Sequence, residues 1–591
     1  MIKKEYEKIL RKVQKPARYT GGEYNEVLKK KSKSGIRFAF AFPDMYEIGM
    51  SNLGLKILYG ILNSLDYVWC ERTFAPGADM AEQLKQNGLD LYALESGDSL
   101  REFDFIGFTL QYELSYSNIL YMLDLANIPA LSSERGGDLP VLIGGGPCAY
   151  NPEPLADFFD LFCVGEGEEV VIELMELYKK HKDSNFNKSE FLSDCAKIEG
   201  IYVPAFPRRV KKRVVADLDL AYAPCAPVVP NIEVVQDRIN LEVFRGCIRG
   251  CRFCQAGFIY RPVRERSPKT LDQIAQNTYA NTGYSEISLS SLSISDYSKL
   301  TELTNDLTCW TGGLNINLSL PSMRIDAFSK SLLEKTSEVR QSSLTFAPEA
   351  GSQKLRDIIN KNLSGQDIEE TVKIAFDFGR SSVKLYFMIG LPGETDGDII
   401  EIANLAKKII GLYHKCENKQ KNKGLTVTVS VASFVPKCHT PFCFEGQPAY
   451  SELIRKQKLL KDEINSKKIK YNYHDAKISK LEAVFSRGDR RLSNVLLKAA
   501  KLGACFDGWD EFFDFELWQK AFDACGLTME EYCEREYGYD ETLPWDFIEA
   551  GVSKDFLIAE HKKSKLGITT ENCREQCQSC GVNGGGKYCI I

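Results

Sequence analysis

Three cysteines in one short segment constrain this chain more than any other feature. The segment Phe244–Cys254 reads FRGCIRGCRFC and places Cys247, Cys251 and Cys254 in a CxxxCxxC spacing. Iron-sulfur clusters are ligated by Cys thiolates and normally take four of them, so three thiolates on one loop can hold three corners of a [4Fe-4S] cubane. One iron is then left open for a small molecule. The alternative is a zinc site, but zinc needs a fourth ligand, and the next cysteine is Cys309.

Length and composition limit the number of domains and the classes of protein to which this chain can belong. A chain of 591 residues is too long for one hydrophobic core and predicts about three or four domains. The net charge of −6 gives no overall basic field, so any contact with RNA must be local. There is no run of about 18 apolar residues and no signal-peptide pattern. We therefore expect a cytoplasmic protein without a membrane segment, in which clustered cysteines are metal ligands rather than disulfides.

A basic segment, residues 1–35, comes first. Its apolar residues Tyr6, Ile9, Leu10 and Val13 recur at helical spacing, which predicts a surface helix. An arm that touches an anionic substrate is the alternative.

The first domain is expected at residues 36–180. Strand-like runs such as IRFAFAF and LPVLIGGG alternate there with helical stretches, which predicts an α/β domain with a doubly wound, Rossmann-like parallel sheet. Ligands of such sheets bind beyond the carboxyl ends of the strands. The turns expected to bind a ligand are therefore 43–54, 109–117, 144–151 and 165–169.

A linker at 181–238, with the basic stretch PRRVKKR, separates this domain from a second strand–helix pattern at 239–445. The linker is expected to be solvated and to pack a short hairpin between domains. Barrel-like α/β domains carry their chemistry at the carboxyl ends of the strands, and the cysteine loop follows the first of these strands. Strands are expected at 239–246, 286–294, 314–326, 342–352, 383–395 and 426–437, each but the last followed by a helix.

The region 446–565 shows helical spacing only, so we expect a helical domain packed by the mouth of the barrel. Within it, Arg487, Asp489, Arg490 and Arg491 lie at a helix start. Their guanidinium groups could bind a phosphate or a carboxylate, or form an internal ion-pair network with Asp489.

The tail, 566–591, contains a second CxxxCxxC pattern. Cys573, Cys577 and Cys580 are followed by Cys589, with glycines between. Four protein thiolates can close completely around a metal, so a structural or redox [4Fe-4S] site is expected, with zinc as the alternative. A tail whose thiols bind no metal is the third interpretation.

The loop at Cys247, Cys251 and Cys254 resembles the signature of the radical S-adenosylmethionine (SAM) enzymes. The resemblance implies a partial (β/α)6 barrel in which the amino and carboxylate groups of SAM chelate the open iron. It also implies that electron transfer breaks a C–S bond of SAM and gives a 5'-deoxyadenosyl radical, with a reductant such as flavodoxin or ferredoxin as partner.

The turns of the first domain, FPDMYEIGMSNLGLKIL, GFTLQYELSYSNIL, IGGGPCAYNPEPL and VGEGEE, resemble those of the cobalamin (B12)-binding domain fused to many radical SAM enzymes. The DxHxxG element that supplies a His to cobalt is missing, and the first His of this chain is His181. Either cobalamin binds without a protein imidazole, or the fold persists without the cofactor.

The radical SAM resemblance also implies roles for residues at the strand ends. Ser290 and Ser291 stand where relatives bind the SAM amino group. Arg324 could pair with the SAM carboxylate or form a salt bridge with Asp326. Glu349, in APEAGS, matches an acidic position that could accept hydrogen bonds from the SAM ribose or ammonium.

Further residues are implied at the adenine end of SAM. Met388 leads into the GLPGET turn at Gly390, whose glycines allow close backbone approach. Phe434 and Pro436 match the adenine-contacting edge of the sixth strand, and Phe253 precedes the third cysteine of the loop. His439 follows the sixth strand beside two cysteines; a core or surface His is usual there, and a catalytic role is the second interpretation.

The sequence therefore predicts a radical SAM enzyme that acts on an unreactive carbon, with methylation or methylthio (sulfur) transfer as the outcome. The substrate could be an RNA, a protein or a small metabolite. The alternative from another class is a non-catalytic iron-sulfur or zinc protein that binds RNA through its basic N-terminus and the 487–491 patch.

Overall fold

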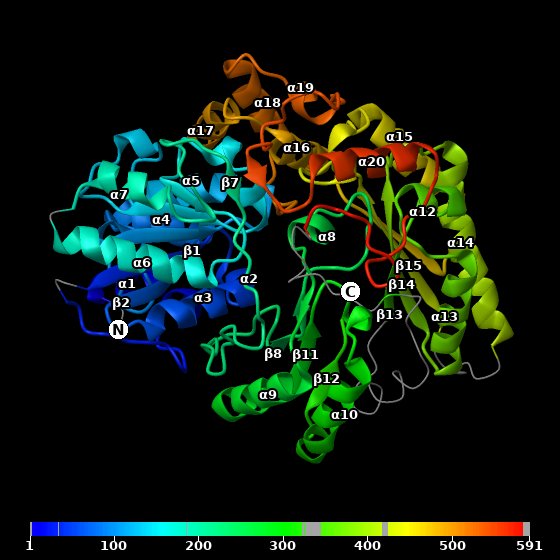
Figure 1. Ribbon diagram of the computed structural model, residues 1–591, viewed down its shortest axis with the longest axis horizontal. Helices are drawn as coiled ribbons and strands as arrows, with labels where there is room; N and C mark the ends of the chain where they lie inside the picture. The colour runs from blue at the N-terminus through cyan, green and yellow to red at the C-terminus, as the bar shows by residue number, and fades with distance from the viewer. Residues whose placement is uncertain are drawn as a thin grey trace.

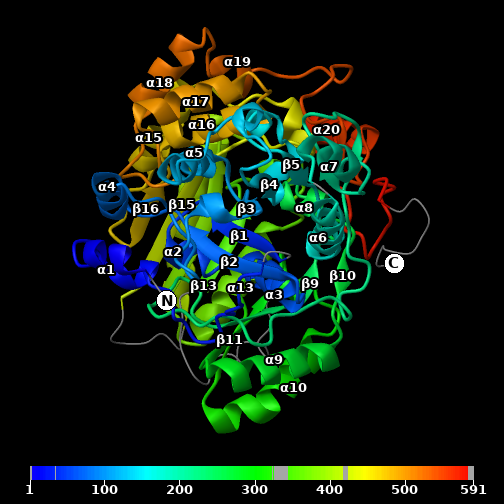
Figure 2. The same ribbon diagram turned by 90° about the vertical axis from the view of Figure 1, so that its left-hand side faces the viewer.

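The computed structural model describes residues 3–32, 35–184, 186–321, 324, 344–416 and 424–582. Two α/β bodies lie side by side, and helices from the last part of the described chain bridge them along one edge (Figure 1). Figure 2 shows the N-terminal domain in front of the barrel.

The N-terminal domain is a doubly wound sheet with the strand order β2-β1-β3-β4-β5-β6 in the described residues. Its strands are parallel except β6, which is antiparallel to β5. The strand order reverses between β1 and β3, and ligands of such sheets bind at that switch point. The strands are β1 (Ile36–Phe42), β2 (Val68–Phe74), β3 (Phe105–Thr109), β4 (Val141–Gly145), β5 (Leu161–Cys163) and β6 (Ile201–Tyr202).

Helices cover both faces of this sheet, which is why strand β1 is a nearly continuous apolar run. Helix α3 contacts α6, whereas α4 contacts α1 and α5. Tyr6, Ile9 and Leu10 of α1 are buried, so the predicted surface helix is confirmed. The helices are α1 (Lys4–Leu10), α2 (Tyr46–Gly49), α3 (Leu53–Ser64), α4 (Ala78–Asn87), α5 (Tyr116–Leu125), α6 (Glu168–Asp183) and α7 (Lys188–Cys195).

The second body contains two parallel sheets, β12-β11-β8 and β13-β14-β15-β16. All six expected strand positions hold strands, which are shorter than predicted, and much of the third segment lies outside the described residues. The strands are β8 (Ile239–Glu242), β11 (Glu286–Ser290), β12 (Asn317–Ser319), β13 (Leu344–Glu349), β14 (Ser382–Ile389), β15 (Thr426–Ser433) and β16 (Ile469–Tyr473). The predicted mixed α/β architecture is confirmed.

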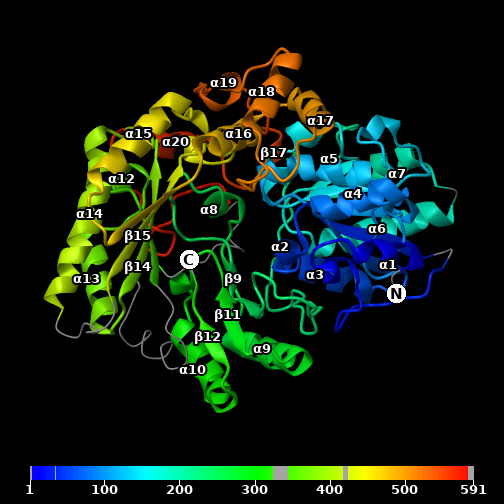
Figure 3. The same cartoon turned by 180° about the vertical axis from the view of Figure 1, so that it is seen from behind.

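Strand β16 corrects the expectation that only helices follow residue 446. It pairs with β15 in parallel after helix α15, so one more strand–helix unit extends the sheet. The outer face of this sheet is covered by α13 and α14 (Figure 3). The helices of this body are α8 (Ala256–Ile259), α9 (Pro268–Thr282), α10 (Leu300–Thr311), α12 (Gln353–Ile358), α13 (Gly365–Asp377), α14 (Asp396–Lys415) and α15 (Tyr450–Glu463).

The C-terminal helices pack on both bodies rather than on the barrel alone. Helix α17 contacts α5 of the N-terminal domain, whereas α20 contacts α12 of the barrel. Lys437, just after β15, donates a hydrogen bond of 2.7 Å to Glu113 of the N-terminal domain and makes an ion pair of 2.7 Å with Glu482. One half-buried lysine thus ties the three parts together. The helices are α16 (Ala476–Arg487), α17 (Leu492–Leu502), α18 (Phe515–Ala524), α19 (Glu530–Cys533) and α20 (Lys554–Lys565).

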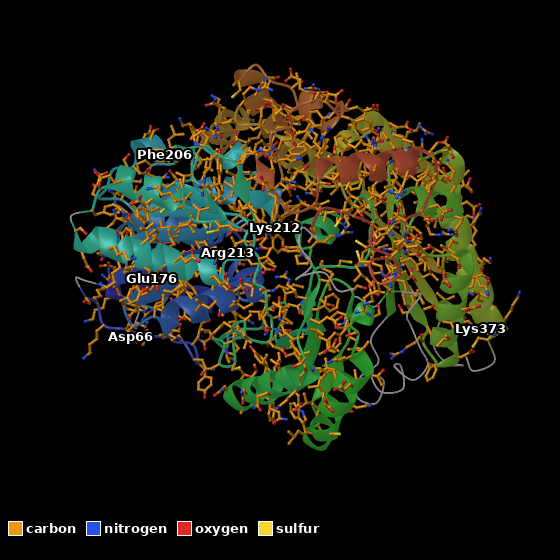
Figure 4. The ribbon with its side chains drawn as sticks, viewed as in Figure 1. Asp66, Glu176, Phe206, Lys212, Arg213 and Lys373 are labelled. Atoms are coloured by element: carbon orange, nitrogen blue, oxygen red, sulfur yellow. The ribbon has the colours of Figure 1, made fainter. Side chains whose placement is uncertain are left out.

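The predicted linker at 181–238 is solvated only in part. Its first portion, with α7 and β6, belongs to the N-terminal domain, whereas Pro207 to Arg209 of the basic stretch are exposed. Its strand β7 (Val210–Lys211) pairs with β17 (Ile548–Glu549), and Lys212 is buried. Figure 4 shows Lys212 and Arg213 at the inner edge of the N-terminal domain. Among the described residues, no helix combines the length and apolar character needed to cross a membrane.

Candidate active site

The first cysteine triad lies on a loop between β9 (Phe244–Arg245) and α8. Gly246 has a φ of +86°, and a Cβ placed there would lie 2.6 Å from the carbonyl oxygen of Pro262. Only glycine therefore lets the loop close against its own return segment. We call residues 246–262 the cluster loop.

Arg252 fixes the cluster loop to the rest of the molecule. Its side chain is 0% exposed. Its guanidinium donates hydrogen bonds to Glu560 Oε2 at 3.1 and 3.2 Å. It also donates to the carbonyl oxygens of Ile358, at 2.8 Å, and Ile568, at 2.6 Å. A buried charge is tolerated only when it is paired, so these contacts lock the loop to the barrel and to the tail.

Burial and a neighbouring thiol both act on Cys247 and Cys254 of the loop. Burial raises the pKa of Cys247 to about 12 and that of Cys254 to about 11, and the neighbouring Cys251 thiol adds to both shifts. The backbone N–H of Arg249 lowers the pKa of Cys247, and that of Gly257 lowers the pKa of Cys254, but each effect is smaller than that of burial. A bound metal deprotonates a coordinating thiol outright. The donor set therefore suits a cationic metal group.

The arrangement fits a cluster better than a single ion. The described residues contain no group of three or more His, Cys, Asp or Glu side chains placed to hold one metal ion. Zinc needs thiolates at about 2.3 Å from one point, whereas each thiolate of a cubane binds a different iron. Cys251 lies near enough to Cys247 and Cys254 to act on their pKa values, and each of the three thiols could bind a different iron of a [4Fe-4S] cluster.

Charged side chains gather beside Cys251. Glu349, the last residue of β13, has a φ of +67° and accepts a hydrogen bond of 3.2 Å from Lys361 Nζ. Burial lowers the pKa of Lys361, but Glu349 and the Cys251 thiol outweigh it and raise that pKa. Arg324 donates from Nη2 to the Lys361 carbonyl oxygen at 3.1 Å. One carboxylate and two cations thus meet at the cluster loop.

A second ion pair holds the same edge of the site. Arg249, inside the cluster loop, donates from Nε to Asp296 at 2.9 Å. Burial raises the pKa of Asp296, but Arg249 outweighs it and lowers that pKa. The backbone N–H of Arg324 donates to Ser295 Oγ at 3.2 Å. The segments that follow β11 and β12 are therefore tied to the loop.

Three of the predicted cofactor residues share one apolar cluster. Phe253, Met388 and Phe434 pack with Ala350, the neighbour of Glu349. The ring of Phe434 meets that of Phe442 edge-on, with centroids 5.8 Å apart. This cluster places apolar side chains beside the charged residues Glu349, Lys361 and Arg324. An apolar surrounding strengthens electrostatic interactions.

Ser290 and Ser291 face a different space, a cavity of about 420 Å³ between the two bodies. Ser291 Oγ is buried and has no hydrogen-bond partner among the described residues. Buried polar atoms are normally satisfied, so an unpaired hydroxyl here marks a place for a ligand group.

This interdomain cavity lies at the switch point of the N-terminal sheet. The predicted ligand-binding turns at 43–54, 109–117, 144–151 and 165–169 all contribute to its lining, as do Glu242, Phe244, Arg245 and Gly246 of the barrel. A Cβ placed on Gly145 would meet nothing closer than 3.7 Å, so this backbone is open to a ligand. No histidine is among its described lining residues.

Two further predicted cofactor residues, Gly390 and Pro436, have structural partners. Gly390, with a φ of +81°, packs against Leu453 and donates its N–H to Glu394 at 2.7 Å. The carbonyl oxygen of Pro436 accepts a hydrogen bond of 2.8 Å from Ser486. Both residues therefore contact the two helices that follow β15, which are α15 and α16.

His439 is a core residue. It is 6% exposed and its Nε2 lies 2.9 Å from the carbonyl oxygen of Tyr150. Burial lowers the pKa of His439 to about 4, so the imidazole is neutral at pH 7 and donates to this carbonyl. It lines a second cavity, of about 880 Å³, together with the linker and α20. These contacts support the core interpretation over a catalytic one.

The arginines near the start of α17 form internal contacts, as one of the two interpretations predicts. Arg487 is 0% exposed and donates to the carbonyl oxygens of Tyr532 and Cys533. Arg490 pairs with Glu153 at 3.0 Å, and Arg491 pairs with Asp489 at 2.8 Å. These contacts support the interpretation of an internal network over that of a phosphate site.

The tail reaches the cluster loop. The N–H of Cys573 donates a hydrogen bond of 3.0 Å to the carbonyl oxygen of Ile248, which follows Cys247. Cys577 is exposed and Cys580 is buried. Cys589 lies outside the described residues.

Sequence reasoning missed Lys361 and the Arg249–Asp296 pair. Lys361 lies in KNLSG after α12, where nothing in the sequence distinguishes it from a surface lysine. The only available signal was its place after a strand end that carries Glu349.

Comparison with known protein families identifies the two bodies. Residues 54–204 match the family model described as "Radical SAM proteins, N-terminal". Residues 241–406 match the radical SAM superfamily. The chain belongs to the radical SAM superfamily. Radical SAM enzymes use a [4Fe-4S] cluster and SAM, so the enzyme interpretation is confirmed and the non-catalytic alternative is set aside.

Two relatives come from Methanocaldococcus jannaschii. The uncharacterized protein MJ0966 is 29% identical over 463 residues, which are 78% of this chain and 90% of the relative. The putative methylthiotransferase MJ0865 is 26% identical over 188 residues, 29% of this chain and 41% of the relative. Among solved structures, the radical SAM methyltransferase TsrM from Kitasatospora setae, with cobalamin and a [4Fe-4S] cluster bound, has a TM-score of 0.51 at 13% identity. It matches over 83% of this chain and 100% of its own. That likeness concerns the fold.

Proposed function

We propose that this radical SAM enzyme methylates an unactivated carbon, with cobalamin held in the interdomain cavity. One observation carries the proposal. The cavity at the switch point of the N-terminal sheet is also lined by Gly246, at the base of the cluster loop, and by Ser290 and Ser291. A group bound there would contact both the ligand-binding turns of one domain and the reactive edge of the other.

Cys247, Cys251 and Cys254 would hold the cluster, and the charged group beside Cys251 would bind SAM. When bound, the cluster and SAM supply reductive cleavage of a C–S bond and a 5'-deoxyadenosyl radical. Lys361 and Arg324 offer cations to the SAM carboxylate, and Glu349 offers a carboxylate to its ammonium or ribose.

The apolar cluster of Phe253, Met388 and Phe434 would pack against the adenine end of SAM. It would also exclude water from the charged group, so that each ionic contact with SAM acts in a low-dielectric surrounding. An external one-electron reductant such as flavodoxin or ferredoxin would complete the system.

The lining of the interdomain cavity supports cobalamin bound without a protein imidazole. Its described residues include no histidine, and its backbone is open at Gly145. Arg245 pairs with Glu168 at 2.5 Å and with Glu242 at 2.9 Å, and Arg264 pairs with Glu166 at 2.7 Å, so the carboxylates of the cavity lining already have cationic partners. A large neutral ring suits such a surface. TsrM, whose fold this chain shares, binds cobalamin as well as a cluster.

Methylthio transfer is the second candidate. The tail cysteines offer a site for another cluster, and a putative methylthiotransferase matches 188 residues of this chain. Its substrate, like that of the first candidate, could be an RNA, a protein or a small molecule.

Cobalt analysis separates the two candidates. The protein is purified anaerobically from cells supplied with cobalamin, and bound cobalt is measured beside SAM-dependent methylation activity. We expect about one cobalt per chain. A cobalt-free enzyme that is fully active would end the methylation proposal and favour the second candidate.

A further inference from the structure

A cavity of about 880 Å³ lies between the linker, the start of α20 and the end of the cluster loop. The paired strands β7 and β17 contribute to its lining, and so does Pro262, the last residue of the cluster loop. Lys212 follows β7 and lies at the edge of the N-terminal domain that faces α8 (Figure 4). We call this space the linker cavity.

Cations outnumber carboxylates in the lining of the linker cavity. It contains five Lys or Arg side chains and three Asp or Glu side chains. Each of the three acids already has a cationic partner: Asp546 pairs with Lys554 at 2.8 Å, Glu199 with Lys211 at 3.2 Å and Glu549 with Arg209 at 3.9 Å. Arg213 pairs with two glutamates outside the lining. Lys212 is then the one lining cation without a carboxylate partner in the part of the chain that the structure describes.

The Lys212 ammonium lies at the wall of the linker cavity. The residue is 5% exposed. Its Nζ donates to the carbonyl oxygen of Ile259 at 2.7 Å and to that of Arg261, both in the cluster loop. A Cβ placed on Gly551, another lining residue, would lie 3.5 Å from this Nζ. An ammonium has three N–H groups, so one is left for a ligand.

Lys29 shows how an ammonium is satisfied by backbone alone. Its Nζ donates to three carbonyl oxygens, those of Asn63, Leu65 and Val68, at 2.7, 2.8 and 2.6 Å. All three N–H groups of Lys29 are therefore used, whereas Lys212 has two such contacts and a cavity beside it. Because buried charges are normally paired, the arrangement at Lys212 indicates a place for an anion.

Two neighbouring features add positive potential at this place. Arg261 is 5% exposed, and its buried Nη1 has no hydrogen-bond partner among the described residues. Burial, together with Arg264 and Arg261, outweighs Glu166 and lowers the pKa of Lys212 to about 7. Helix α20, 12 residues long, also begins at the cavity. The first turn of a helix leaves backbone N–H groups free and attracts anions, phosphate in particular.

The rest of the lining suits an organic group. Leu543, Trp545, Ile548 and Leu557 contribute apolar surface to the same cavity. A ligand that carries both an anionic group and an apolar body would use both parts of the lining. Phosphate fits the anionic part, because a lysine ammonium and a helix N-terminus are both common phosphate partners.

We propose that the linker cavity binds the phosphate group of a small organic molecule, with the Lys212 ammonium and the N-terminus of α20 as its partners. The bound molecule would also contact Pro262 of the cluster loop. This ligand is distinct from SAM and from cobalamin, so the inference does not rest on the proposed methylation.

Phosphorus NMR titration of the reconstituted full chain tests the site, with SAM in excess so that its own site is filled. The probes are inorganic phosphate and phenyl phosphate, and the latter should bind at least about ten-fold more tightly, because its ring covers apolar surface. Lys212→Met should raise the dissociation constant of phenyl phosphate at least about ten-fold, whereas Lys29→Met should leave it unchanged. Absence of binding to the wild type, equal affinity of the two probes, or wild-type affinity in Lys212→Met would overturn the proposal.

A second pair of variants separates the charge from the packing of the loop, because Lys212→Met also removes two hydrogen bonds to that loop. Val552 lines the cavity and is half-buried. Val552→Glu places a carboxylate there and should weaken phenyl phosphate binding at least about ten-fold, whereas Val552→Gln, of the same size, should bind much as the wild type does. Retained binding in Val552→Glu, or an equal loss in both variants, would contradict an anion site.

Discussion

Lys361 Nζ lies 3.2 Å from Glu349 Oε1, and this largely buried ion pair stands next to Cys251. SAM carries one ammonium and one carboxylate on its methionine part. The pair therefore offers one partner to each charge of the ligand, at the carboxyl end of β13, where the fold places binding groups. A ligand that inserts between the two side chains would exchange one ion pair for two.

Removing either member of the pair should weaken SAM binding. We expect Glu349→Gln and Lys361→Met to raise the dissociation constant of SAM about 10- to 100-fold, because each removes a hydrogen bond to a charged group. Anaerobic titration calorimetry of the reconstituted protein measures this. Lys408→Met, on the exposed face of α14 where Lys408 pairs with Glu369, is the matched control and should bind as the wild type does. Wild-type affinity in both test variants would show that SAM binds elsewhere.

Arg252 should be essential for the stability of the cluster loop. Arg252→Met leaves Glu560 buried without its guanidinium partner and should lower the free energy of unfolding by about 3 kcal/mol or more. Denaturant unfolding of the cluster-free protein measures the loss. The double variant Arg252→Met/Glu560→Gln should regain part of it, since the buried carboxylate that has lost its guanidinium partner is gone. Equal losses in the single and double variants would contradict the role given to this pair.

Acid should destabilise the protein through His439. Its pKa is about 4 in the folded state and about 6.5 in the unfolded chain, so between these values only the unfolded chain binds the proton. Stability is therefore lost as the pH falls through this range. From pH 7.5 to 5.5 the wild type should lose roughly 1.3 kcal/mol more than His439→Asn, a residue that tolerates the φ of +58°. Identical pH dependence of the two unfolding midpoints would argue against a neutral, buried imidazole.

Filling the interdomain cavity should block cobalamin. Gly145→Leu places a side chain in open space of the cavity, so the domain should fold while bound cobalt falls about ten-fold or more. Gly411→Leu, on the solvent side of α14 where a Cβ meets no atom within 4 Å, is the control. Cobalt retained in Gly145→Leu would place the cofactor outside this cavity.

The fold was predictable where periodicity and strand ends carry the information. The doubly wound sheet, the six strand positions and the cysteine loop follow from alternating apolar runs and from the CxxxCxxC spacing. Strand β16 was missed because its sequence, IKYNY, alternates weakly and is half exposed at the edge of the sheet.

The candidate site was predictable only in part, because side-chain partners depend on tertiary contacts. Phe253 of the cluster loop comes together with Met388 and Phe434 of the strand ends, and Gly390 and Pro436 also contact the neighbouring helices. Arg487 carries the same charge as a phosphate-binding arginine, and only the fold shows that it is buried against backbone carbonyls.

The most direct test of the account is the formation of 5'-deoxyadenosine by the anaerobically reconstituted protein supplied with SAM and dithionite. The account predicts this product from the wild type, its loss in Cys251→Ala, and its retention in Cys309→Ala. A wild-type protein whose loop cluster is intact by spectroscopy, yet which leaves SAM uncleaved or cleaves it equally well without Cys251, would contradict the claim that this loop is the reactive centre.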